Sequence, residues 1–462
     1  MVTMSKLLVK ELRRITLLWE ELWLGTLNHV QHDLTRRIAQ LEEGVQRIQK
    51  NETLSKAEKE AILQEKHKAI LKPIVFALEQ VELLTSRQAE TPNEKLFQQN
   101  FSGQIARALT ALKQPENLEK PSSCWSLFKQ FHNYLNQRAN RRAHSFLHLL
   151  DISPKLSEIR DSPIPLPGLS CNSGQVLTIS SMSNSINILP TKTKPKKLVF
   201  TGSDGKRHTY LFKGLEDLHL DERIMQFLTI VNTMFGRNRK SDASLYHACH
   251  YSVTPLGPRS GLIQWVDGAF ALYGLYKRWQ QREAVSMSIS KGGETVTAQP
   301  PMRPSELYFN KITSALKKEF LESSKFLLFF ADFTSLLFSI PIFSHSTKSY
   351  GLYGGANEWW YLTQSFSRST AVMSIIGYII GLGDRHLDNV LVNFLTGEVV
   401  HIDYNVCFEK GKNLRIPERV PFRLTQNIQQ ALGLTGIEGA FRYSCEEVLK
   451  ILRKGRETLL TP

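Results

Sequence analysis

Residues 381–389 read Gly-Leu-Gly-Asp-Arg-His-Leu-Asp-Asn, and residues 401–405 read His-Ile-Asp-Tyr-Asn. Four residues separate Asp384 from Asn389, and Asp403 lies in the second motif. Phosphoryl transfer from ATP uses one carboxylate to take or orient a hydroxyl proton, and an amide and a second carboxylate to hold the bridging metal. The spacing therefore predicts a phosphoryl-transfer site with Asp384 as the base and with Asn389 and Asp403 as metal ligands.

The sequence around these motifs predicts a helix followed by a strand hairpin. Helical periodicity covers residues 357–378, and short apolar runs at 390–392 and 399–402 are typical of paired strands. Asn389 and Asp403 are therefore expected at the ends of these strands, where a rigid scaffold can hold a metal between them.

Upstream of the motifs the pattern changes from helices to short strands. Residues 5–140 place apolar side chains at helical spacing, starting with one amphipathic run over 8–22, and four antiparallel helices are the simplest arrangement. Ser55 and Glu58 form a capping box at the start of a long helix. Residues 152–175 are rich in Pro, Ser and Gly and predict an extended connector. Strands are predicted at 176–179, 186–189, 197–200, 209–212, 251–253 and 261–266, with a helix at 221–235.

A second set of residues is expected to bind the nucleotide. Lys213 leaves a predicted strand, and the carboxylates of Glu216 and Asp221 follow closely enough to orient its ammonium group toward phosphates. Taken alone, a Lys at a strand end is more often a solvated charge. No Gly-x-Gly-x-x-Gly or Walker motif is present, and the basic loop at 190–197 is equally well explained as a phosphate cover or as a solvated turn.

Adenine needs a flat apolar slot and backbone hydrogen bonds. Residues 261–268 are expected to link a small β-rich lobe to a larger helical lobe. Trp265 could stack on the base and Val266 could offer its backbone, while Leu391 and Ile402 could form the floor of the slot.

Composition sets broad limits on partners and compartment. The 462 residues include 58 Lys and Arg against 43 acidic residues, and the resulting charge of +15 suits nucleotide phosphates, nucleic acid or acidic surfaces. A basic solvated surface explains the same excess equally well. The five cysteines form no Cys-x-x-Cys pair, which argues against a zinc site or a disulfide framework and fits a reducing compartment. The N-terminal segment predicts no signal peptide.

Together these motifs resemble the phosphatidylinositol 3-kinase-related protein kinases. In Leu-Gly-Asp-Arg-His-x-x-Asn the Arg and His follow the Asp, whereas in ordinary protein kinases they precede it. Tyr404-Asn405, where most relatives have Phe-Gly, resembles the branch of the family that acts in nonsense-mediated mRNA decay. Further agreement comes from Lys-Gly-Leu-Glu-Asp-Leu at 213–218, Arg-Ser-Gly-Leu-Ile-Gln-Trp-Val at 259–266 and Val-Pro-Phe-Arg-Leu-Thr-Gln-Asn at 420–427.

The resemblance implies an α+β fold: an N-terminal four-helix bundle and then a two-lobed protein-kinase-like catalytic domain of the phosphatidylinositol 3/4-kinase type. The region opening at residues 11–23 resembles the family's FKBP-rapamycin-binding (FRB) domain. The family's last helices and its FATC segment are absent, so a truncated C-lobe is expected. The expected domains are the bundle at 1–140, a connector at 141–175, the N-lobe at 176–268 and the C-lobe at 269–462.

The resemblance also implies a role for each candidate residue. The catalytic residues would be Asp384, His386, which would stabilise the transferring phosphate, and Lys213. The cofactors would be ATP and Mg²⁺ or Mn²⁺, with the metal held by Asn389 and Asp403. The ATP contacts would be Lys213, Glu216, Asp221, Trp265, Val266, Leu391 and Ile402.

The same resemblance implies a substrate and partners. The acceptor would be Ser or Thr followed by Gln, chiefly in the up-frameshift RNA helicase. Regulatory subunits of the kinase complex would bind directly and the mRNA surveillance complex indirectly. The protein would be cytoplasmic and nuclear, without membrane association.

Two other functions stay open at this point. A lipid kinase of the same fold needs a dense basic cluster in the activation loop. Here Lys410, Lys412, Arg415 and Arg419 are spread out and partly balanced by acidic residues, which favours a protein substrate. The second alternative is a catalytically impaired fragment that acts as a binding module through its helical bundle.

Residues 319–356 do not resemble the family. Within them, residues 326–343 are almost wholly apolar and nearly long enough to span a bilayer. Asp332 opposes a span, because a mid-membrane carboxylate costs roughly 2.5–3.5 kcal/mol, and Pro341 also weakens it. A buried or interface helix, or a segment foreign to the fold such as a retained intron or a gene-model error, is favoured instead.

Overall fold

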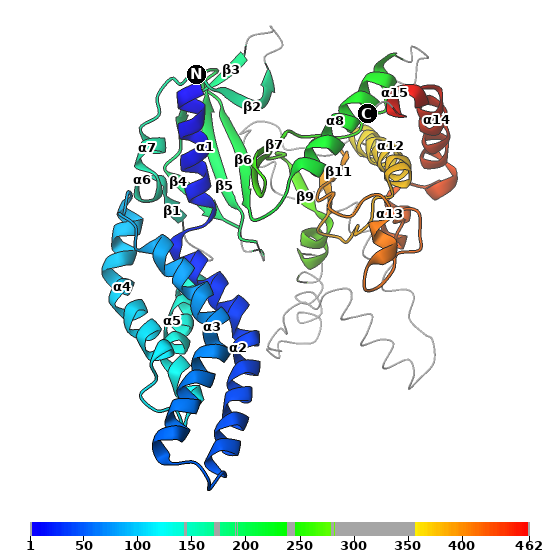
Figure 1. Cartoon of the computed structure of the whole chain (residues 1–462). Helices are drawn as coiled ribbons and strands as arrows, with labels where there is room; N and C mark the ends of the chain where they lie inside the picture. The colour runs from blue at the N-terminus through cyan, green and yellow to red at the C-terminus, as the bar shows by residue number, and fades with distance from the viewer. Residues whose placement is uncertain are drawn as a thin grey trace, which may run out of the picture. The chain divides into compact units, whose positions relative to one another are not determined.

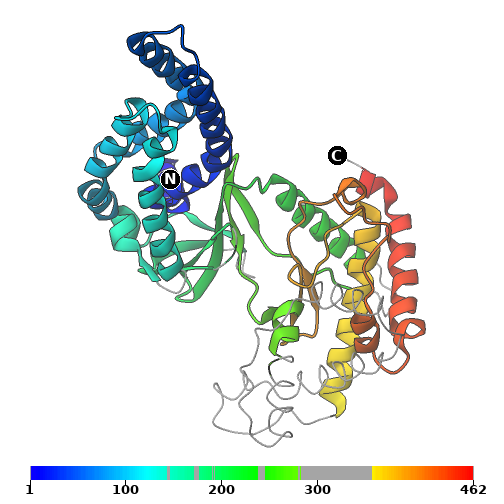
Figure 2. The same cartoon turned by 90° about the horizontal axis from the view of Figure 1, so that it is seen from below.

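The computed structural model describes residues 2–142, 146–170, 176–189, 191, 193–237, 245–278, 281 and 356–460 (Figures 1 and 2). The chain forms two compact units. The first contains residues 1–218 and 252–265, and the second contains residues 219–251 and 266–462. Helices and antiparallel sheets occur together, so the predicted α+β class is confirmed. The atypical segment at 319–355, with its apolar run, lies outside the described residues.

The helices α2 to α5 pack around an apolar core rich in aromatic side chains. Trp23 is fully buried against Phe128 and Phe131, and its indole N–H donates to the Thr85 hydroxyl over 3.1 Å. The capping box predicted at Ser55 is present at the start of α3, and a second one begins α4. The bounds are α2 (Trp19–Gln49), α3 (Lys56–Thr85), α4 (Pro92–Lys113) and α5 (Ser126–Arg142).

The expectation of one amphipathic run over residues 8–22 is wrong. The helix α1 (Val2–Thr16) ends before α2 begins, and its apolar face packs on the sheet instead of joining the bundle (Figure 1). The buried ammonium of Lys196 lies at the break between the two helices. It donates to the Thr16 carbonyl over 2.8 Å, at the end of α1, and to the Glu21 carboxylate over 2.6 Å, in the first turn of α2.

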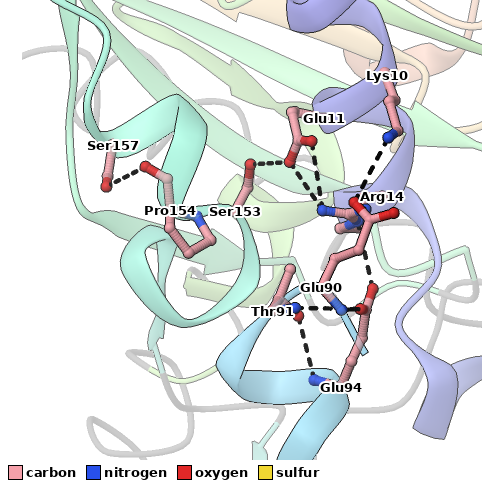
Figure 3. A network of polar contacts seen from close by, with 9 residues as sticks. All are labelled: Lys10, Glu11, Arg14, Glu90, Thr91, Glu94, Ser153, Pro154 and Ser157. Atoms are coloured by element: carbon pink, nitrogen blue, oxygen red, sulfur yellow. Dashed lines mark hydrogen bonds and ion pairs between the residues drawn. The ribbon is translucent and has the colours of Figure 1, made fainter. Parts of the chain in front are cut away.

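A polar network ties α1 to other parts of the first unit (Figure 3). The fully buried Glu11 carboxylate accepts from the Ser153 hydroxyl over 2.6 Å and pairs with Arg14 over 3.2 Å. Arg14 also pairs with Glu90 over 2.5 Å and with Glu94 over 3.3 Å. A buried carboxylate persists only when it is paired, so these contacts fix the position of α1 beside the loop between α3 and α4.

Eight antiparallel strands form the sheet of the first unit. The order along the sheet is β1-β4-β5-β6-β8-β7, and β3 pairs with β5 and β2. Phe200 and Phe212 are fully buried beneath α1. The strands are β1 (Phe146–His148), β2 (Pro165–Ser170), β3 (Val176–Met182), β4 (Ser185–Ile188), β5 (Lys196–Gly202), β6 (Arg207–Gly214), β7 (Val253–Gly257) and β8 (Ser260–Gln264).

The connector predicted at 152–175 is more ordered than its composition suggests. It contains β2, and two short helices, α6 (Leu149–Ile152) and α7 (Pro154–Ser157), lie at its start. Leu156 and Leu166 are buried in the core that also contains α1. Two prolines are tolerated in β2 because, among the strands that the structure describes, it pairs only with β3 and so lies at the edge of the sheet.

The second unit consists mainly of helices around a three-stranded antiparallel sheet in the order β11-β10-β9. The predicted helix and hairpin around the phosphoryl-transfer motifs are both observed. No helix among the described residues has the length and apolar character needed to span a membrane. The main elements are α8 (His219–Arg237), β9 (Ala269–Ala271), α12 (Ala356–Ile380), β10 (Val390–Asn393), β11 (Val399–His401), α13 (Gln426–Ala431), α14 (Ala440–Lys454) and α15 (Arg456–Leu460).

Candidate active site

The loop that joins α12 to β10 holds Asp384 by its backbone. The amide N–H of Asp384 donates to Oε1 of Glu418 over 2.8 Å, and its carbonyl accepts from Nδ2 of Asn389 over 2.9 Å. Asp384 has a φ of +55°, in the left-handed region that most side chains avoid. Strained backbone of this kind persists where surrounding contacts hold it, and it is common at functional sites. The backbone that carries the half-buried Asp384 carboxylate is thus held at both its N–H and its carbonyl.

Arg385 joins the two sequence motifs. Its buried guanidinium donates to the carbonyls of Gly383 over 2.9 Å and of Ile402 over 2.8 Å, and also to the carbonyl of Asp403. A planar fork of five N–H donors suits such a set of carbonyls. Burial and the Arg385 charge lower the pKa of His401 to about 3, so this imidazole is neutral. The sequence analysis gave Arg385 no role, because its acceptors come from a distant part of the chain.

Asn389 and Asp403 lie at the same end of the β10–β11 hairpin. Val390 pairs with His401 in the ladder, and the amide of Ile402 donates to the Asn389 carbonyl over 3.1 Å. The predicted position of the two residues at strand ends is therefore observed. Because Nδ2 of Asn389 donates to Asp384, its amide oxygen remains for a cation. An amide oxygen and a carboxylate are hard donors that suit Mg²⁺, so the donor set fits the expected metal.

His386 is half-exposed, and one hydrogen bond indicates which of its ring nitrogens carries the proton. Nδ1 accepts from the Asp388 backbone N–H over 3.2 Å. In a neutral imidazole the other nitrogen then carries the proton. Nε2–H is therefore the group that can donate to a phosphate oxygen, as the predicted role requires.

Lys213 lies in β6, where it pairs with Gly261 of β8. Its ammonium is 3.2 Å from the Glu216 carboxylate, and both side chains are mostly buried. Asp221 belongs to the second unit, where its buried carboxylate accepts from the Tyr404 amide over 3.2 Å. Glu216 thus orients Lys213 in the first unit, while Asp221 supports the residue that follows Asp403.

The residues predicted to line an adenine slot are all half-buried. Trp265 ends the first unit, where its amide donates to the Thr209 carbonyl over 3.0 Å. The Lys197 ammonium lies 4.1 Å from the centre of the Trp265 ring, a cation–π contact on its face. Val266 begins the second unit. Leu391 lies in β10, and Ile402 directly follows β11.

Glu418 is a second residue that the sequence analysis did not assign to the site. Its backbone amide donates to the Gly411 carbonyl over 3.0 Å while its side chain accepts from Asp384. A Cβ atom at Gly383 would overlap Oε2 of Glu418. Glycine at this position therefore lets the carboxylate approach the loop that carries Asp384.

Comparison with known proteins agrees with this geometry. The family model described as phosphatidylinositol 3- and 4-kinase matches residues 208–461. The chain therefore belongs to the phosphatidylinositol 3- and 4-kinase family, and the resemblance predicted from its motifs is confirmed.

Several individual members of this family are similar to the chain. Serine/threonine-protein kinase SMG1 of Danio rerio is 54% identical over 472 residues, which cover 100% of this chain and 13% of the relative. Smg1 of Drosophila melanogaster is 44% identical over 99% of this chain and 14% of the relative. The target of rapamycin homolog of Caenorhabditis elegans is 30% identical over 100% of this chain and 16% of the relative. A solved structure, "Complete CtTel1 dimer with C2 symmetry", has a TM-score of 0.49 at 20% identity over 93% of this chain and 19% of that chain.

Proposed function

We propose that this chain carries an ATP-dependent protein serine/threonine kinase domain. The observation that supports this most strongly is the convergence of Asp384, Asn389 and Asp403 at one end of the β10–β11 hairpin, joined by the Arg385 guanidinium. Asp384 would orient the acceptor hydroxyl and take its proton, and His386 Nε2–H would donate to the transferring phosphate. Mg²⁺ or Mn²⁺, held by Asn389 and Asp403, would neutralise the charge on the phosphates when bound.

The acceptor is proposed to be Ser or Thr followed by Gln. The similarity to proteins named as SMG1 kinases supports a role in nonsense-mediated mRNA decay, with the up-frameshift RNA helicase as substrate. Regulatory SMG-family subunits would be direct partners and the mRNA surveillance complex an indirect one. The proposed location is the cytoplasm and nucleus.

A protein acceptor is favoured over an inositol lipid by the charges of the segment after Asp403. An inositol phosphate needs several unpaired cations close together. In this segment Lys412 pairs with Glu409 over 2.6 Å, and the Lys410 ammonium donates to the Asn405 carbonyl over 3.4 Å. Of these two basic side chains, Lys412 is therefore already paired with a carboxylate.

Transfer of labelled phosphate from ATP tests this proposal. The acceptors are a peptide containing Ser-Gln, the same peptide with Ser-Ala, and vesicles containing phosphatidylinositol. The expected result is label on the Ser-Gln peptide alone, and none with the Asp384→Ala variant. Label on the lipid would favour the lipid-kinase alternative, and equal background with both proteins would favour a fragment that only binds partners.

A further inference from the structure

Three metal-ligating side chains meet in the second unit, away from the phosphoryl-transfer residues. His247 and Cys249 lie in the segment after α8, and Glu398 lies in the turn between β10 and β11. One ligand atom from each lies within 4.8 Å of the other two. Nδ1 of His247 and Oε1 of Glu398 are 3.1 Å apart. The cluster is at the turn of the hairpin, whereas Asn389 and Asp403 are at its opposite end.

The neighbouring contacts hold these side chains in place. The Thr396 hydroxyl donates to Oε2 of Glu398 over 2.9 Å, which leaves Oε1 directed at His247. Ala248 lies between His247 and Cys249 in the sequence, and its backbone forms two hydrogen bonds with the Asn232 side chain of α8. The Ala248 N–H donates to Oδ1 over 2.8 Å, and the Ala248 carbonyl accepts from Nδ2 over 2.9 Å. Such supporting contacts around the ligands are typical of metal sites.

The donor set indicates the class of ion. Imidazole, thiolate and carboxylate together favour Zn²⁺ over Mg²⁺, which prefers oxygen ligands alone. Zn²⁺ bonds of about 2.0–2.3 Å in a tetrahedron place ligand atoms roughly 3.3–3.8 Å apart. The His247–Glu398 pair is already near that separation, and the other separations in the cluster need to shorten by at most about 1 Å.

We propose that His247, Cys249 and Glu398 form a Zn²⁺ site, with water as the fourth ligand. Cys249 gives up its thiol proton to solvent and His247 binds as the neutral imidazole. The charges of the thiolate and of the Glu398 carboxylate balance the two positive charges of the ion. Bound metal would join the segment after α8 to the hairpin that carries Asn389 and Asp403.

A thiol that is protonated in solution can still become a ligand, because a coordinating metal ion deprotonates it outright. The sequence argued against a zinc site because no cysteine pair is present, and it could not reveal this one because the third ligand is distant in the chain.

Cobalt and zinc binding to the purified chain test the proposal. Co²⁺ bound by a thiolate gives an intense near-ultraviolet charge-transfer band that oxygen ligands cannot give. The wild type is expected to show this band, to lose it on Zn²⁺ addition, and to retain one Zn²⁺ per chain after dialysis. The Cys249→Ser variant should lose the band. The matched control Cys445→Ser, a half-buried cysteine of α14 outside the cluster, should keep it.

Two further variants separate ligand loss from misfolding. His247 is half-exposed, so His247→Ala should retain the wild-type circular dichroism spectrum while Zn²⁺ affinity falls tenfold or more. Glu398→Gln should weaken Zn²⁺ binding similarly. The proposal is overturned if the wild type gives no band, or if Cys249→Ser gives the same band. Because the band requires a thiolate and not phosphate transfer, its absence leaves the proposed kinase function untouched.

Discussion

Glu418 is expected to control the rate of phosphate transfer without touching the substrate. Its carboxylate accepts the Asp384 amide hydrogen over 2.8 Å and so holds Asp384 in its left-handed conformation. The Glu418→Ala variant removes the acceptor and leaves that N–H without its partner. Asp384 is then free to relax toward a more favourable φ, which turns its carboxylate away from the acceptor hydroxyl.

The size of the effect follows from the type of hydrogen bond that is lost. A hydrogen bond to a charged acceptor contributes about 1.5–3 kcal/mol, and each 1.4 kcal/mol of lost transition-state stabilisation lowers the rate about tenfold. Glu418→Ala should therefore lower kcat roughly 10- to 150-fold. Glu418→Gln keeps a neutral acceptor that retains about 0.5–1.5 kcal/mol, so its loss should be roughly five- to tenfold.

Steady-state phosphorylation of the Ser-Gln peptide measures both variants, with the KM for ATP as a second readout. Glu409 is the matched control, because it lies in the same segment, is exposed and pairs with Lys412. Glu409→Ala and Glu409→Gln should keep the wild-type kcat. Wild-type kcat in Glu418→Ala, or an equal loss of activity in the Glu409 variants, would show that Glu418 does not position Asp384.

Three other substitutions test separate parts of the structure. Arg385→Lys keeps the charge but loses the planar fork, so it should lower the melting temperature and abolish most transfer. Arg442, an exposed residue of α14, is the control, and Arg442→Lys should change neither quantity. Lys213→Met should weaken ATP binding at least tenfold, measured by titration calorimetry, with the circular dichroism spectrum unchanged; unaltered affinity would exclude Lys213 from the nucleotide site. Trp23→Ala should destabilise the bundle by about 3–5 kcal/mol in urea unfolding, and a change below about 1 kcal/mol would contradict its core position.

The sequence was sufficient to predict those features of the structure that depend on contacts between residues close together in the chain. The capping box at Ser55 needs only Glu58, three residues ahead, and the β10–β11 hairpin follows from two short apolar runs around Gly397. The spacing of Asp384 and Asn389 likewise places both residues in one loop without the help of any tertiary contact. In these cases one helix turn, one hairpin or one short loop contains all the residues involved.

The sequence was insufficient to predict those features that depend on a residue distant in the chain. The apolar periodicity continues from α1 into α2, and the break between them lies where Lys196, from the distant sheet, contacts both helices. Arg385 and Glu418 have roles that depend on carbonyls and amides brought close by the fold. The sequence did not predict the strand β2, because its prolines argue against a strand. Prolines are compatible with β2 because it lies at the edge of the sheet.

In the proposed division of roles, Asn389 and Asp403 hold the metal of metal-bound ATP, and Asp384 takes the proton of the acceptor hydroxyl. Titration of ATP into the protein with Mg²⁺ or Mn²⁺, beside transfer to the Ser-Gln peptide, separates the two roles. Asp384→Ala should bind metal-ATP within about threefold of wild type and transfer no phosphate. Asp403→Ala should lose the metal-dependent part of ATP binding. Undiminished transfer by Asp384→Ala would exclude Asp384 as the proton acceptor, and undiminished metal-dependent ATP binding by Asp403→Ala would exclude Asp403 as a metal ligand.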